Sequence, residues 1–146
     1  MRAYDNVYVG NIVDLQGQVF LDIRDELPGV DEKWFIEKFM RSHIRKMLDI
    51  GNFKYALKPP VEIIWDFLEE LGGEYERGEE WGGFLPQWVG MVYAMYQWKY
   101  NTPSAQLIEL LPLAEMERVF GTLHQTGIES GADKLHEVVL GLPPED

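Results

Sequence analysis

The three histidines are the first side chains to test for metal or acid–base chemistry: His43, His124 and His136. A zinc site needs ligands at short, regular spacing, such as two histidines one helical turn apart. No such pair is present, and only Asp133 shares a predicted helix face with His136. The chain also has no cysteine, which excludes disulfides, thiolate ligands and a cysteine nucleophile. The sequence therefore predicts no metal site and no cofactor.

Side chains suited to catalysis are present, but not in a catalytic pattern. Closely spaced carboxylates occur at Glu69–Glu70, Glu79–Glu80 and Glu115–Glu117. The surface of an acidic protein accounts for all of them. A serine nucleophile needs a base within hydrogen-bond reach, and none is recognisable beside Ser42, Ser104 or Ser130. Nucleophile-elbow, dinucleotide and phosphate-loop motifs are missing as well. An enzyme is therefore the less favoured interpretation.

One ligand pocket can still be proposed from the sequence. Tyr96 and Gln97 belong to an aromatic segment, and His124 lies in a loop between two predicted helices. A small-molecule-binding protein or an enzyme that uses these three side chains is the alternative function. An imidazole can also order its loop through a hydrogen bond. We expect His124 to do this and to bind no metal.

The favoured site is an acidic loop, residues 72–83, with the sequence GGEYERGEEWGG. Its glycines predict a flexible surface segment. Exposed carboxylates would steer a basic partner, and an aromatic side chain would anchor the partner once it is bound. The predicted partner-binding residues are the acids and aromatics of this loop: Glu74, Tyr75, Glu76, Glu79, Glu80 and Trp81.

The charge of the whole chain favours the same kind of partner. The net charge is −12, from 25 acidic and 13 basic residues, and the basic residues form no long stripe. Direct nucleic-acid binding is not expected, because a phosphate backbone requires a basic surface. The predicted function is that of a small acidic interaction protein with a basic protein partner. An acidic mimic of nucleic acid that inhibits a DNA-binding protein is a further alternative. Nothing in the sequence indicates an oligomeric state.

The elements that must position these residues are predicted to be helices. Residues 7–27 are ambiguous, because apolar spacing favours a helix from about 10 to 27 while short alternating runs allow a β-hairpin. Elsewhere apolar residues recur at helical spacing between start and stop signals. These segments are residues 31–51, 60–71, 103–111, 112–120 and 128–139, with a short connector at 53–58.

The predicted helix at residues 85–100 is apolar on every side. A bilayer span requires about 20 apolar residues, and Pro86 and Gln97 interrupt this shorter run, so no membrane helix is predicted. Such a helix is suited to the centre of a bundle. We predict one all-α domain over residues 1–146, an irregular bundle of about six helices around this segment. The start of the chain has no basic region followed by an apolar one, and a cytoplasmic location is expected.

Three stretches together carry a resemblance: EKWFIEKFMRSHIRKMLDIGN, WVGMVYAMYQWKYNTPSAQLIELLP and MERVFGTLHQTGIESGADKL. They resemble a group of small uncharacterised bacterial proteins associated with toxin–antitoxin-like and mobile-element gene neighbourhoods. The positions that match the pattern lie within residues 31–139 and are Trp88, Gly90, Tyr93, Gln97 or Trp98, Ser104 and His124. The sequence departs from the pattern after His124, where Gly127 and Ser130 make a looser loop. The resemblance implies no known activity. It implies a partner-binding role, of which antitoxin-like binding is one form.

Overall fold

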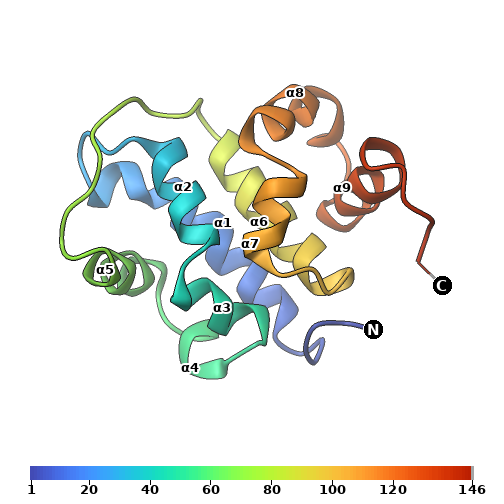
Figure 1. Cartoon of the computed structure of the whole chain (residues 1–146), viewed down its shortest axis with the longest axis horizontal. Coiled ribbons are helices and arrows are strands. Elements are labelled where there is room, and N and C mark those ends of the chain that lie inside the picture. Colours follow the sequence, from blue (N-terminus) through green and yellow to red (C-terminus); the bar gives the residue numbers. More distant parts are fainter. Residues whose placement is uncertain (146) are drawn as a thin grey trace.

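The computed structural model describes residues 1–145, and within them the fold is all-α, with nine α-helices, a short π-helix and no β-strand (Figure 1). The N-terminal segment forms helix α1 (Val9–Glu26), so the helix expected there is confirmed and the β-hairpin alternative is wrong. The β-hairpin would have required a turn at Gly17, between two runs in which apolar and polar residues alternate. This glycine lies inside α1, where an added Cβ would be 2.4 Å from the side chain of Met91. It therefore marks a close helix contact and not a turn.

Helices α1 and α6 (Leu85–Lys99) cross at the centre of the molecule (Figure 1). Gly90 of α6 lies at the crossing, where an added Cβ would be 2.7 Å from the carbonyl oxygen of Gln16. The Gln16 side chain is buried, and its amide nitrogen donates to the carbonyl of Gly90 at 2.7 Å. A missing side chain and a buried amide hydrogen bond together set this close contact.

Helix α6 is buried on almost every side, so the aromatic cluster expected at the core is present. Its fully or nearly fully buried side chains include Trp88, Val89, Val92, Tyr93 and Tyr96. The Tyr93 hydroxyl donates to the carbonyl of Leu111, which satisfies a polar group in an apolar surrounding. Within residues 1–145, no helix has both the length and the apolar character needed to cross a membrane.

The helix expected over residues 31–51 is two helices, α2 (Glu32–Met40) and α3 (His43–Asp49). Ser42 separates them. Its hydroxyl accepts from the amide of Arg45 at 3.0 Å and donates to the carbonyl of Phe39 at 2.7 Å. A serine that caps a new helix turns the chain although the apolar spacing continues. The predicted connector that follows contains a single helical turn, α4 (Phe53–Ala56).

Phenylalanine rings join α5 (Pro60–Glu70) to α1 and α2. Phe67 of α5 meets Phe35 and Phe39 of α2 at ring-centroid distances of 5.0 and 5.3 Å, nearly at right angles. Phe20 of α1 meets Phe39 in the same way at 5.7 Å. Edge-to-face contacts of this kind add to the stabilisation from burial.

The C-terminal part packs along α6, from Trp88 near its start to Tyr96 near its end. It consists of α7 (Ser104–Leu110), α8 (Leu113–Leu123), α9 (Ile128–Lys134) and the π-helix (Leu135–Val139). The expected helix at 128–139 corresponds to α9 followed directly by the π-helix. The break at Ser42 and the helical turn α4 raise the number of helices above the predicted number of about six. Figure 1 shows α5 at one end of the molecule and α8 and α9 at the other.

Candidate partner-binding site

The acidic loop, residues 72–83, forms backbone hydrogen bonds with the segment that precedes α2. The amide of Asp31 donates to the carbonyl of Glu76 at 2.9 Å, and the amide of Gly78 donates to the carbonyl of Gly29 at 3.0 Å. An isolated antiparallel bridge joins the same two segments. The loop was expected to be flexible because of its glycines, but backbone hydrogen bonds hold it against the start of α2.

A buried carboxylate, that of Glu32 at the start of α2, binds the inner side of the loop. Its side chain is 0% exposed. One carboxylate oxygen accepts from Arg24 of α1 at 2.9 Å and from the amide of Trp81 at 3.1 Å. The amide of Glu32 donates to the carbonyl of Glu79 at 3.3 Å. A buried carboxylate is tolerated only with such partners, so this contact set fixes the loop relative to α1 and α2.

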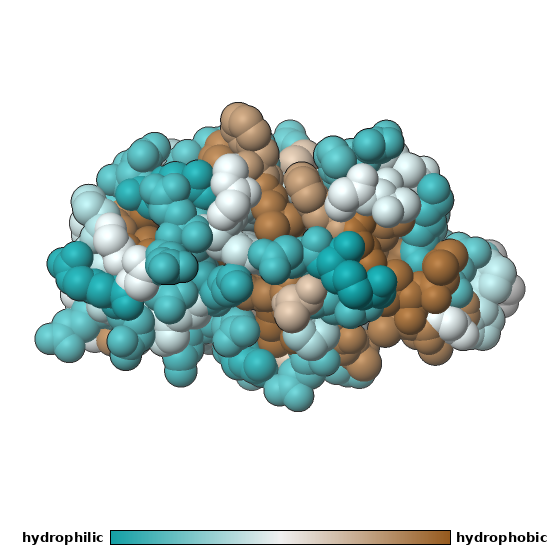
Figure 2. Space-filling model, turned by 90° about the horizontal axis from the view of Figure 1, so that it is seen from above, coloured by the Kyte–Doolittle hydropathy of each residue, from teal (hydrophilic) through white to brown (hydrophobic). Residues whose placement is uncertain are grey.

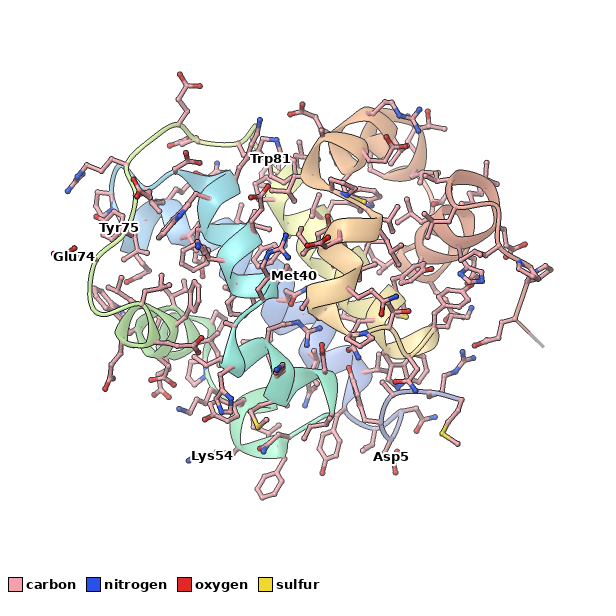
Figure 3. All side chains as sticks on the ribbon, viewed as in Figure 1. Asp5, Met40, Lys54, Glu74, Tyr75 and Trp81 are labelled. Carbon is pink, nitrogen blue, oxygen red and sulfur yellow. The ribbon has the colours of Figure 1, made fainter. Side chains whose placement is uncertain are left out.

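Trp81 does not have the exposure that an anchoring side chain needs. It is 3% exposed, and its indole nitrogen donates to the carboxylate of Glu117 on α8 at 2.8 Å. Figure 3 places Trp81 at the far end of the loop from Glu74 and Tyr75. The exposed aromatic residue of this region is Phe84, 73% exposed, directly before α6. Sequence reasoning missed it, although its position after two glycines was the available signal.

Beside Trp81 lies a recess of about 500 Å³ lined mainly by carboxylates. They come from the N-cap of α2, the loop and α8, and are those of Asp31, Glu79, Glu80 and Glu117. Lys33 is the basic side chain in the lining. Gly78 permits this geometry, because a Cβ there would lie 2.7 Å from the Cβ of Asp31. Figure 2 shows the face that carries the loop, and hydrophilic side chains cover its left part, where the loop runs.

The remaining predicted residues of the loop lie at its outer edge. Glu74 and Glu76 are exposed, and Tyr75 is half-buried. The Tyr75 hydroxyl donates to the carbonyl of Pro28 at 3.0 Å, and Arg77 lies over its ring. The structure therefore brings Glu79 and Glu80 to the recess and keeps Glu74, Tyr75 and Glu76 outside it.

The three residues of the expected ligand pocket have separate partners. The amide nitrogen of Gln97 donates to the carbonyl of Asp49 at 3.1 Å. The Tyr96 hydroxyl contacts His136. The exposed His124 follows α8, donates through Nδ1 to a carbonyl of that helix at 2.5 Å and stacks on the ring of Phe120. His124 thus contacts the last turn of α8, and it makes no hydrogen bond to Tyr96 or Gln97.

A cluster that sequence reasoning missed surrounds His136 in the π-helix. Its Nδ1 lies 2.8 Å from the Tyr96 hydroxyl, and its Nε2 lies 2.9 Å from the carbonyl of Pro143. A carbonyl can only accept, so Nε2 carries a proton, and in the neutral ring Nδ1 accepts from Tyr96. The ring also stacks on Tyr100 at 3.8 Å. Tyr96 and Tyr100 are one helical turn apart, which was the only sequence signal for this contact.

Three charged groups beside this cluster pair with one another. Lys99 contacts Glu129 and Asp133, each at 2.8 Å. Burial alone would lower the pKa of Lys99, but the hydrogen bonds to the two carboxylates outweigh it and raise that pKa. Burial likewise opposes ionisation of Asp133, yet hydrogen bonds from Lys99 and Tyr100 hold its pKa below the usual value. These groups stabilise the contact between α6 and α9.

A second buried polar network centres on Asp49 at the end of α3. Its carboxylate accepts from the fully buried Arg45 at 3.1 Å and from the Ser104 hydroxyl at 2.6 Å. The amide of Ser104, the first residue of α7, donates to it at 3.0 Å. Burial lowers the pKa of Arg45 from its ordinary value. This network joins α3 to α7 and pairs one guanidinium nitrogen of Arg45 with Asp49.

No group of three or more potential ligand side chains in residues 1–145 is placed to hold a metal ion. No protein-family model matches this sequence, and no curated protein and no solved structure shows detectable similarity to it.

Proposed function

We propose that this chain is an interaction protein that binds a basic protein partner through the acidic recess. The observation that supports this most is the gathering of Asp31, Glu79, Glu80 and Glu117 around one hollow, with Lys33 beside them. Carboxylates held together repel one another, and a cationic side chain that enters between them relieves this repulsion. Arginine suits the recess best, because its planar guanidinium pairs with carboxylates through two parallel hydrogen bonds.

The arrangement of the loop favours binding because little of it has to be ordered. Glu32 accepts a hydrogen bond from the Trp81 amide, and backbone hydrogen bonds join the loop to the segment before α2. A preorganised site loses less conformational entropy on association than a mobile one. The exposed Phe84 lies two residues after Gly82, which lines the recess. It replaces Trp81 as the aromatic contact with the partner.

Two classes of basic partner suit this face. The first is a basic toxin, which this chain would neutralise as an antitoxin-like protein. The second is a DNA-binding protein, whose basic surface this chain would occupy as a nucleic-acid mimic. An enzyme using the aromatic helix has less support. Tyr96 and both ring nitrogens of His136 are already engaged within the chain.

Titration with a short arginine-rich peptide, followed by tryptophan fluorescence, tests the recess directly. Trp81 lines the recess and is expected to report occupancy. Glu79→Gln with Glu80→Gln should weaken binding about tenfold or more, which corresponds to about 1.4 kcal/mol or more. Binding to the wild-type chain should also weaken as salt rises, because exposed charges are screened.

The matched control is Asp14→Asn with Glu37→Gln. It makes the same change of charge at exposed positions of α1 and α2, outside the recess. The peptide should bind this variant almost as tightly as the wild type. Equal weakening by the two pairs of substitutions would mean that net charge attracts the peptide, and the recess would not be the site.

A further inference from the structure

Exposed hydrophobic side chains concentrate on α4, the turns beside it, and α5. Ile50, Phe53 and Leu57 are each between 60% and 65% exposed, and Val61 and Trp65 follow on the outer side of α5. Single apolar residues on a surface are ordinary, whereas a gathering of large ones marks an interaction site. This gathering lies outside the acidic loop and is not explained by the proposed function.

The first part of this surface is basic. Residues 38–58 hold six of the thirteen basic residues of the chain and only one acidic residue, Asp49, although the whole chain carries −12. Lys46 and Lys54 are exposed and form no ion pair within residues 1–145. We call these two lysines, with the adjacent Phe53 and Leu57, the basic strip.

The second part is acidic. Between residues 59 and 76 there is no basic residue, and the outer face of α5 carries four acids. We call this face the acidic strip. Its members are Glu62, Asp66, Glu69 and Glu70, with the exposed Val61 and Trp65.

The two strips lie side by side across a hollow of about 580 Å³. Lys54 and Lys58 line one side of it, and Asp66, Glu69 and Glu70 line the other. Lys58, which follows Leu57 of the basic strip, forms an ion pair of 2.5 Å with Asp66 of the acidic strip, so the two strips are neighbours. One continuous surface therefore carries a basic strip and an acidic strip, and each strip includes exposed apolar side chains.

We propose that α4 and α5 form the interface of a homodimer, in which the basic strip of each copy covers the acidic strip of the other. In a twofold dimer, if residue i of one copy contacts residue j of the other, then residue j of the first copy contacts residue i of the second. A surface with two adjacent, complementary strips satisfies this condition with a single kind of partner. The exposed aromatic and aliphatic residues would then become buried at the centre of the contact.

A membrane surface fits this region less well. Lysines with protruding apolar side chains suit anionic lipids. Anionic lipids would repel the four acids beside the lysines, and they would also repel the chain as a whole, whose net charge is −12. The dimer surface is also separate from the recess. Figure 3 shows Lys54 and Trp81 at opposite edges of the molecule.

Sedimentation velocity from low to high micromolar concentration, with paired charge-reversal variants, tests the proposal. The wild type should approach twice the 17.0 kDa mass of the chain as concentration rises. Lys46→Glu with Lys54→Glu should be monomeric, and so should Glu62→Lys with Glu69→Lys. An equimolar mixture of the two variants should form a heterodimer, because both strip contacts regain opposite charges. Circular dichroism would confirm that each variant keeps its helices.

Two control variants locate the contact. Phe53→Ser should shift dimerisation to at least about tenfold higher concentration, whereas Phe84→Ser, at an equally exposed aromatic residue elsewhere, should not. Glu79→Lys with Glu80→Lys should leave the dimer intact, so the recess and the dimer surface can fail independently. A wild type that stays monomeric throughout, or a variant mixture that forms no heterodimer, overturns the proposal. Binding to phosphatidylserine vesicles by a monomeric wild type, lost in Phe53→Ser, would assign the surface to membranes instead.

Discussion

Gly90 is the residue at which the two central helices come closest. An alanine there would gain about 1 kcal/mol of helix propensity. Its Cβ would lie 2.7 Å from the carbonyl oxygen of Gln16 and 3.0 Å from the ring of Phe20, and a backbone oxygen cannot move aside alone. The helices would have to separate, which typically costs about 1–3 kcal/mol beyond the propensity gain. Gly90→Ala should therefore lower the free energy of unfolding, as measured by urea denaturation.

The control for this substitution is Gly121→Ala in α8. A Cβ there meets no atom within 4 Å, and the residue is exposed. This change should raise the free energy of unfolding by about 0.5–1 kcal/mol. If Gly90→Ala stabilised the chain to the same extent, α1 and α6 would not be in the close contact described above.

Elements with their own start and stop signals could be predicted well. Helix α5 begins at Pro60 and ends before two glycines, close to the expected limits of 60–71. Helix α6 has a proline in its first turn and matches the expected 85–100. The helix at 31–51 was predicted wrongly because the periodicity of apolar residues continues through Ser42. The capping hydrogen bond of that serine is visible only in the folded chain.

The acidic loop could be predicted from the sequence, but its contacts with the rest of the chain could not. The glycines and glutamates of residues 72–83 predicted an acidic surface loop. The burial of Trp81 depends on Glu32, 49 residues earlier in the chain, and on Glu117 in another helix. Contacts over such separations leave no local signal. The same reason explains why the pairing of Tyr96 with His136, 40 residues away, was not foreseen.

The acidic loop gives a prediction at the scale of an element. Glu32→Ala removes the acceptor of the Trp81 amide and the charged partner of Arg24. A hydrogen bond to a charged group contributes about 1.5–3 kcal/mol, so the exchange rate of the Trp81 amide should rise about tenfold to a hundredfold. Amides in the middle of α6 should change much less. Native-state hydrogen exchange measures both.

The matched control is Glu37→Ala, which removes an exposed carboxylate from the same helix. It should leave exchange in the loop unchanged. If hydrogen exchange in Glu32→Ala became faster to the same extent at all amides, the buried carboxylate would stabilise the whole fold and not the loop in particular.

Over the whole molecule, buried tyrosines set the limit of stability at high pH. Burial raises the pKa of Tyr4 and that of Tyr96 to about 12. Burial also raises the pKa values of Tyr93 and Tyr100 well above the usual value. In the unfolded chain a tyrosine loses its proton near pH 10. The folded protein keeps these protons longer, so its stability is complete below about pH 10 and falls as pH rises further.

The expected result is alkaline unfolding in which tyrosinate absorbance and loss of helical circular dichroism occur together above about pH 10. Each tyrosine that stays protonated in the folded state contributes a slope of about 1.4 kcal/mol per pH unit to the free energy of unfolding. Tyr96→Phe should reduce this slope by about one such contribution between pH 10 and 12, the interval between the unfolded and folded pKa values of Tyr96. Lys99 also loses its ion pairs as pH rises, because its raised pKa stabilises the fold only while it is charged. This contribution is the same in the wild type and in Tyr96→Phe. Complete tyrosinate formation with the helical signal intact would show that these hydroxyls are open to solvent and that the core around α6 is looser than described.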